Sequence, residues 1–179
     1  MGAATPLRLD RPLVLIGPMA SGKSTIGHAF AAEHGLDFAD SDKRIVDRHG
    51  PIPAIFTALG EHAFRELEAR EVAGLVADGT PRVVSLGGGA ILDTGTQQLL
   101  ARCTVVFLDV DLDTVRPRIE RETGRPLLAG DPVARWNELA MRRRPTYQRL
   151  ADIVLDTRGK SAADVVRELT EHIFERQSR

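Results

Sequence analysis

The chain has 179 residues, about the size of one domain, and its apolar fraction of 42% and charged fraction of 27% are typical of a folded globular protein. Its 24 basic and 25 acidic residues give a formal net charge of −1, which argues against a protein that binds nucleic acid through a basic field. No apolar run approaches the roughly 20 residues of a membrane-spanning helix, and residues 1–11 lack the apolar core of a signal peptide.

The one cysteine, Cys103, has no partner for an internal disulfide, as is usual for proteins of the reducing cytosol. It comes just before an apolar run, so we expect a buried thiol rather than a nucleophile. These features predict a cytoplasmic protein that has neither a membrane partner nor a nucleic-acid partner. We also expect it to be a monomer.

The first predicted element is a strand at residues 13–16, a continuous apolar run ended by Gly17, as in strands buried on both faces of a sheet. After a loop, residues 23–33 have helical composition, and Gly35 is placed to end that helix. Later apolar runs predict four more strands, at residues 36–39, 82–86, 104–110 and 153–155. Later segments predict five more helices, at residues 42–49, 60–78, 113–121, 132–150 and 161–177.

Two of these predicted helices contain a proline, which removes a backbone hydrogen-bond donor. Pro117 lies inside the helix at 113–121, and Pro145 is expected to disturb the helix at 132–150. Between them, residues 122–132 are polar and contain glycine and proline, which predicts a loop. The last helix has Ser161 at its N-cap and an apolar face formed by Val165, Val166, Leu169 and Ile173.

The alternation of strands and helices predicts an α/β fold, with a five-stranded parallel sheet covered by helices on both faces. In such folds the ligands bind at the carboxyl ends of the strands. Every motif described below lies at such an end. Since no repeat or low-complexity linker is present, we expect residues 1–179 to form a single domain.

The segment Gly17-Pro18-Met19-Ala20-Ser21-Gly22-Lys23-Ser24 matches the P-loop pattern G-x-x-x-x-G-K-[ST]. It follows a predicted strand and opens a predicted helix, which is the context that distinguishes a P-loop from a chance glycine-rich turn. Backbone N–H groups of such a loop hold the phosphates of a nucleotide. Lys23 would reach the outer phosphates, and the Ser24 hydroxyl would bind Mg²⁺. A P-loop alone does not separate kinases from other nucleotide-binding proteins.

Asp40-Ser41-Asp42 ends the second predicted strand. One carboxylate could hold a metal ion through water, and the other could accept a hydrogen bond from an acceptor hydroxyl. Alternatively, Asp42 or Ser41 caps the next helix.

Arg65 has Glu61 four residues before it and Glu68 three residues after it, so it either binds a ligand or belongs to an exposed ladder of weak ion pairs. Gly87, Gly88 and Gly89 end the third strand. They either let the backbone approach a ligand and offer N–H donors, or form a flexible turn.

The second half of the chain offers two further basic features. Arg125 begins the segment R-P-L-L in the predicted loop, where an arginine is usually solvated. Arg142-Arg143-Arg144 precede Pro145, and at most one or two of these arginines can face a pocket. A solvated basic face is the alternative interpretation.

Taken together and in order, these segments resemble the shikimate kinase family, enzymes of the pathway to chorismate and the aromatic amino acids. The resemblance runs from Pro12 to about Glu171 and rests on G-P-M-A-S-G-K-S-T, D-S-D, F-R-E-L-E, S-L-G-G-G-A, R-P-L-L and R-R-P-T-Y. It implies a P-loop kinase fold like that of nucleoside monophosphate kinases. Within that fold it implies an acceptor-binding segment at about 41–67 and a mobile lid at about 121–132.

The resemblance also implies the reaction, a direct transfer from MgATP to the 3-hydroxyl of shikimate that gives shikimate 3-phosphate and ADP. The implied catalytic residues are Lys23, Asp42 as acceptor-binding residue and base, and Arg125 as lid arginine. The implied metal site is Ser24, with Asp40 acting through water. The ATP-binding set is Ala20, Ser21, Gly22, Lys23, Ser24, Thr25, Arg118 and Arg125, with Thr157 and Arg158 near adenine. The shikimate-binding set is Asp42, Arg65, Gly87, Gly88, Gly89 and Arg144, in which Arg65 and Arg144 grip the carboxylate.

Two residues depart from the family pattern. Ala20 stands where the family commonly has glycine, so a positive φ at that position would be unfavourable. Pro117 interrupts the helix that carries Arg118, and this argues against a role for Arg118 beside adenine.

Two other functions compete with this interpretation. A related small-molecule kinase, such as a gluconate kinase, would also use arginines to bind a carboxylate. A nucleotide-sensing module without catalysis would be expected to lack acceptor residues, yet Asp42, Arg65 and Arg144 are all present.

Overall fold

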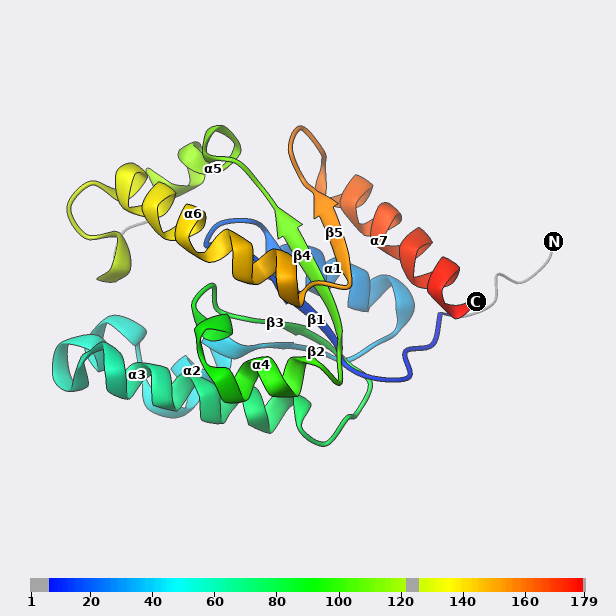
Figure 1. Cartoon of the computed structure of the whole chain (residues 1–179), viewed down its shortest axis with the longest axis horizontal. Helices are drawn as coiled ribbons and strands as arrows, with labels where there is room; N and C mark the ends of the chain where they lie inside the picture. Colours follow the sequence, from blue (N-terminus) through cyan, green and yellow to red (C-terminus); the bar gives the residue numbers. More distant parts are fainter. Residues whose placement is uncertain (1–6, 122–125, 179) are drawn as a thin grey trace.

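The computed structural model describes residues 7–121 and 126–178, in which the five predicted strands form one sheet (Figure 1). The strand order is β2-β3-β1-β4-β5, and every neighbouring pair is parallel. The strands are β1 (Leu13–Ile16), β2 (Phe38–Asp40), β3 (Val83–Ser85), β4 (Thr104–Asp109) and β5 (Ile153–Asp156). The predicted fold class is confirmed.

Helices connect the strands and cover the sheet. The α-helices are α1 (Lys23–His34), α2 (Ser41–His49), α3 (Ile52–Val76), α4 (Thr94–Leu100), α5 (Leu112–Ile119), α6 (Pro132–Leu150) and α7 (Ala162–Gln177). Two short 3₁₀ helices are η1 (Ala90–Leu92) and η2 (Pro126–Leu128). Helix α4 and the two 3₁₀ helices are not among the predicted elements.

The central strand β1 is apolar and buried throughout, because both faces of the sheet are covered there. Along β1, Leu13 and Leu15 pack against one apolar cluster, whereas Val14 and Ile16 pack against another. The first cluster includes residues of α1 and α7, and the second includes residues of α3, α4 and α6. In Figure 1 these two groups of helices lie on opposite sides of the sheet.

The prolines and one glycine affect the helices differently from expectation. The prediction that Pro145 disturbs α6 is wrong, because the helix continues to Leu150. Its last turns are held by Tyr147, which is buried and stacks on Phe107 of β4 with ring centroids 5.2 Å apart. Helix α3 begins earlier than predicted and has a kink at Gly60, where φ is 81° and ψ is 173°.

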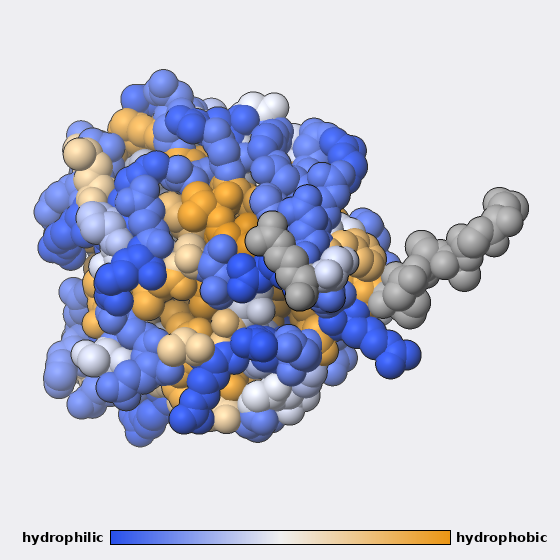
Figure 2. All heavy atoms as spheres, turned by 45° about the vertical axis from the view of Figure 1, so that its right-hand side comes forward, coloured by the Kyte–Doolittle hydropathy of each residue, from blue (hydrophilic) through white to orange (hydrophobic). Residues whose placement is uncertain are grey.

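Cys103 is buried, and burial raises the pKa of its thiol to about 11, as expected of a packed side chain. Across the residues that the structure describes, no helix is both long enough and apolar enough to span a bilayer. The face drawn in Figure 2 is mostly hydrophilic, and its apolar residues gather mainly in the central part of the face.

Candidate active site

The P-loop forms a phosphate cradle between β1 and α1. Gly17 has a φ of 147°, and a Cβ there would lie 2.8 Å from the carbonyl oxygen of Leu108, so the loop closes on β4 only with glycine. Gly22 caps α1 in a left-handed conformation. The first turn of α1 therefore directs N–H groups without intrahelical acceptors toward the carboxyl edge of the sheet, where an anion can bind.

Lys23 lies inside this cradle and is only 8% exposed. Its Nζ donates to the carbonyl oxygens of Gly17 at 2.9 Å and Pro18 at 2.8 Å, and lies 3.3 Å from the Ser21 hydroxyl. These bonds hold the ammonium group at the cradle, where it can transfer to a phosphate oxygen when a nucleotide binds.

Hard oxygen donors gather beside the cradle. The Ser24 hydroxyl donates to the Asp40 carboxylate, and the hydroxyl of Ser85, at the end of β3, lies 3.3 Å from that of Ser24. Asp40 also accepts from the backbone N–H of Lys43 at 3.1 Å, so it is the N-cap of α2. The alternative in which Asp42 or Ser41 caps this helix is therefore wrong. A hydroxyl and a carboxylate next to a phosphate site are suitable ligands for Mg²⁺.

A cleft of about 800 Å³ runs from the cradle along the carboxyl edge of the sheet. Among the described residues, it is lined by most of the predicted site: Ala20, Ser21, Gly22, Lys23, Ser24, Thr25, Asp40, Asp42, Arg65, Gly87, Gly88, Gly89, Arg118 and Thr157. Cleft-lining side chains of Val46, Ile52, Phe56 and Phe64 add an apolar wall on the side of α2 and α3. Parts of the chain far apart in sequence thus converge on one cavity.

At the acceptor end of this cleft, Asp42 and Glu68 face the same backbone atom. A Cβ on Gly87 would lie 2.5 Å from Oδ1 of Asp42 and 2.8 Å from Oε1 of Glu68. The Gly87 N–H donates to the buried hydroxyl of Ser41 at 2.9 Å. A side chain at position 87 would therefore displace these carboxyl groups. The N–H of Gly87, predicted as a ligand donor, is used in a bond to Ser41.

The other two glycines are also fixed by their neighbours. The carbonyl oxygen of Gly88 accepts from the Tyr147 hydroxyl at 2.5 Å. A Cβ on Gly89 would overlap the guanidinium of Arg65. The glycine segment is therefore a constrained wall of the cleft, and the alternative of a flexible turn is wrong.

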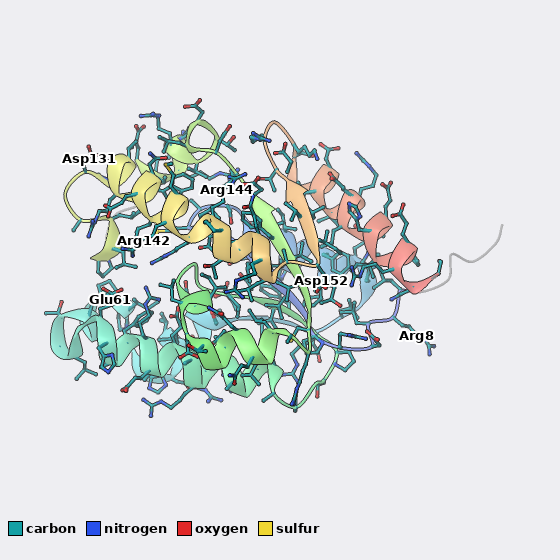
Figure 3. The ribbon with its side chains drawn as sticks, in the orientation of Figure 1. Arg8, Glu61, Asp131, Arg142, Arg144 and Asp152 are labelled. Carbon is teal, nitrogen blue, oxygen red and sulfur yellow. The ribbon has the colours of Figure 1, made fainter. Side chains whose placement is uncertain are left out.

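Among the three adjacent arginines of α6, Arg143 rather than Arg144 faces the cleft. Arg143 is 4% exposed and lines the cavity with Arg65 and Glu68. Arg144 donates to Asp109 at 2.5 Å and, in Figure 3, lies on the side of α6 near the end of β4. The prediction that Arg144 faces the acceptor is therefore corrected to Arg143.

The two cleft arginines have unused hydrogen-bonding capacity. Within the described residues, Nε of Arg65 and Nε of Arg143 are both buried and have no hydrogen-bond partner. Because both arginines line one cleft, their guanidinium groups are placed to bind an anionic ligand there. A carboxylate is such a ligand, because it presents two acceptor oxygens to planar guanidinium groups.

Glu68 is a site residue that the sequence analysis treated only as part of an ion-pair ladder. It is 2% exposed and accepts from Arg65 Nη1 at 2.6 Å, whereas Glu61 lies 3.5 Å from Arg65 at the surface. Burial raises the pKa of Glu68 to about 7, although the positive charge of Arg65 opposes this. The alternative of an exposed ladder is therefore wrong for its Glu68 half.

This raised pKa predicts a pH-dependent stability that Glu68→Gln removes. Between the ordinary value of 4.5 and about 7, the folded state binds a proton that the unfolded state has lost. Stability should therefore fall as pH rises through this window, by up to about 3 kcal/mol. The amide has no such transition, so the variant should gain stability relative to wild type between about pH 5 and pH 8 in thermal unfolding.

Glu61→Gln is the matched control, because Glu61 contacts the same arginine at the surface. It should follow the wild-type pH curve. Parallel curves for Glu68→Gln and wild type would show that Glu68 does not titrate in this range.

Of the residues predicted to lie near adenine, two line the cleft and one does not. Arg118 lines the cleft, and its Nη1 donates to the Ala20 carbonyl at 2.8 Å, so Pro117 does not remove it from the site. Thr157 lines the cleft, whereas Arg158 pairs with Asp156 at 2.7 Å and is not among the lining residues. Arg125 and most of the first half of the predicted lid lie outside the described residues. Pro126 and Leu127, from η2, line the cleft.

The chain is similar to known proteins in both sequence and structure. The family model for shikimate kinase matches residues 19–174. A shikimate kinase of Stenotrophomonas maltophilia is 46% identical over 160 residues, which are 88% of each chain. The solved structure of a shikimate kinase from Acinetobacter baumannii in complex with shikimate has a TM-score of 0.89 at 31% identity, covering 94% of this chain and 96% of that one. A gluconokinase from Sinorhizobium meliloti has a TM-score of 0.63 at 20% identity, with 94% of each chain covered, and shows the fold alone.

Proposed function

The chain belongs to the shikimate kinase family, and from that membership we infer that it is an ATP-dependent kinase that phosphorylates the 3-hydroxyl of shikimate. The products are shikimate 3-phosphate and ADP, in a step of chorismate and aromatic amino acid biosynthesis. The observation that carries the acceptor assignment is that two arginines, Arg65 and Arg143, line one cleft together with Asp42.

On the donor side, the cradle binds the phosphates of ATP. The N–H groups at the start of α1 and the ammonium of Lys23 surround the β- and γ-phosphates, where negative charge is concentrated during transfer. Ser24 and Asp40 would hold Mg²⁺, Asp40 through water, and the ion would neutralise phosphate charge. The hydroxyl–carboxylate contact between these two residues supports this assignment.

On the acceptor side, the two arginines orient the ring of shikimate by binding its carboxylate. Asp42 accepts a hydrogen bond from the reacting hydroxyl and can take its proton, and Gly87 to Gly89 form the wall against which the ring packs. The alcohol oxygen then attacks the terminal phosphorus in line with the departing ADP oxygen, without a covalent enzyme intermediate.

We extend the proposal to the organisation of the whole chain. Residues 1–179 act as one domain in which residues 41–67 bind the acceptor and residues 121–132 form the lid, with Arg125 directed at the phosphates. The enzyme works in the cytoplasm as a monomer on small molecules, without a nucleic-acid or membrane partner. The near-neutral net charge supports the absence of a nucleic-acid partner.

A coupled assay for ADP release tests this function and its key residue together. Wild type should release ADP with shikimate and far more slowly with gluconate, which bears a carboxylate but no ring. Arg143→Ala should raise the KM for shikimate at least tenfold, since one charge-assisted hydrogen bond contributes about 1.5–3 kcal/mol.

Arg144→Ala is the matched control from the next position of the same helix. It should leave the KM for shikimate within about twofold of wild type and lower the melting temperature, because Asp109 loses its ion-pair partner. A larger KM effect from Arg144→Ala than from Arg143→Ala would reverse the assignment. Faster turnover with gluconate than with shikimate would reject the proposed acceptor.

A further inference from the structure

The phosphate cradle contains one strained residue. Ala20 has a φ of 63°, and no other non-glycine residue in the described ranges has a positive φ. In that region the Cβ of an L-amino acid crowds a neighbouring carbonyl oxygen, so the surroundings must hold the residue there. Whatever holds Ala20 also sets the path by which the chain enters α1.

Side chains from two other helices bond the carbonyl groups on both sides of the Ala20 α-carbon. Nε1 of Trp136, in α6, donates to the Met19 carbonyl at 2.8 Å, and Nη1 of Arg118, in α5, donates to the Ala20 carbonyl at 2.8 Å. Each carbonyl belongs to one of the two peptide planes that meet at Ala20. Because φ and ψ describe the rotation of these planes, holding both carbonyls holds the strained conformation.

Packing acts in the same direction as these bonds. Met19 and Ala20 contact an apolar cluster that is separate from the two clusters on the sheet. Its buried members are Val110, Val115, Ile119, Leu128, Trp136 and Leu139. Since Trp136 is only 3% exposed, its indole N–H is largely screened from water and depends on the Met19 carbonyl.

We propose that Trp136 is a positioning residue for nucleotide binding, whose N–H holds the Met19–Ala20 peptide in the strained turn that forms the cradle. The proposal rests on the proposed function only in that the cradle binds nucleotide phosphates. Trp136 is not among the residues that line the cleft, so it acts through the loop and not by touching the nucleotide. Arg118 shares this task but also lines the cleft, which makes Trp136 the cleaner residue to test.

A double-mutant cycle with Ala20→Gly tests this proposal. Trp136→Phe keeps an aromatic ring in the cluster and removes the N–H donor. We expect it to weaken MgADP binding roughly fivefold in calorimetry, the effect of losing one ordinary hydrogen bond. Glycine adopts a positive φ without crowding. In the Ala20→Gly background, Trp136→Phe should therefore weaken binding by less than about twofold.

The rescue by Ala20→Gly separates positioning from a general loss of stability. Ile173→Ala is the control, because Ile173 is buried in the cluster shared by α1 and α7 and not in the one that Met19 and Ala20 contact. It should lower the melting temperature while leaving MgADP affinity within about twofold. Unchanged affinity in Trp136→Phe, or an equal loss in both backgrounds, would overturn the proposal. The proposed function would be rejected if the wild-type protein bound MgADP but released no ADP with shikimate. The double-mutant cycle could still be interpreted in that case, because it measures only MgADP binding.

Discussion

Lys23→Met is expected to lower kcat at least a hundredfold while leaving the protein folded. Its ammonium is held within the cradle by the carbonyl oxygens of Gly17 and Pro18. In the proposed function the negative charge of the transferred group develops at this position. Removing one preorganised electrostatic donor typically slows an enzyme about 10²–10³-fold. Methionine keeps much of the buried stem, so the loss should reflect the missing charge. Steady-state turnover with saturating MgATP and shikimate measures it.

Lys23 has a structural part that the measurement must separate from catalysis, because its Nζ bonds also tie the loop to itself. Thermal unfolding of Lys23→Met should therefore show a modest decrease in melting temperature alongside the kinetic loss. Lys43→Met is the matched control, since Lys43 is exposed and pairs with Asp47 on the outside of α2. Near-normal turnover in Lys23→Met would reject the phosphate cradle as the donor site.

Asp42→Asn is expected to lower kcat about 10²–10⁴-fold and to leave MgADP affinity within about twofold of wild type. Asp42 lines the acceptor end of the cleft beside Gly87, whereas Asp40 contacts Ser24 at the proposed metal site. An amide can still hydrogen-bond the acceptor hydroxyl but cannot take its proton. The change should therefore appear in kcat for shikimate and not in nucleotide binding.

Asp47→Asn serves as the control, because Asp47 is an exposed carboxylate of the same helix and pairs with Lys43 at the surface. It should leave both kinetic constants unchanged. If Asp42→Asn weakened MgADP binding strongly and left the KM for shikimate unchanged, Asp42 would belong to the metal site.

The strands and the cradle could be predicted because their signals are local. The continuous apolar runs at β1 and β4 require burial on both faces, and the spacing from Gly17 to Ser24 fixes a loop conformation. The first part of α3 was missed because Pro51, Pro53 and Gly60 mark a loop when taken singly. In the structure Pro51 is the N-cap, and Gly60 bends the helix without ending it.

The choice between Arg143 and Arg144 depends on the rotation of α6, which packing fixes. A signal for it was nonetheless present, since the buried residues Trp136, Leu139, Arg143 and Tyr147 follow one another at spacings of three, four and four. Glu68 lies in a similar stripe of α3 between Phe64 and Val72. A charged residue within an apolar stripe thus marks a side chain that must have a partner inside the protein.

Three consecutive residues, where β2 ends and α2 begins, reach three different parts of the site. Asp40 contacts Ser24 of the cradle, Ser41 bonds the N–H of Gly87, and Asp42 faces the acceptor end of the cleft. The separation between the proposed donor and acceptor positions is thus set by two peptide units, each spanning about 3.8 Å between α-carbons. Because these peptide units are covalently linked, thermal motion of the helices cannot lengthen the distance that they span. A single-residue insertion or deletion in this tripeptide would shift all three contacts at once.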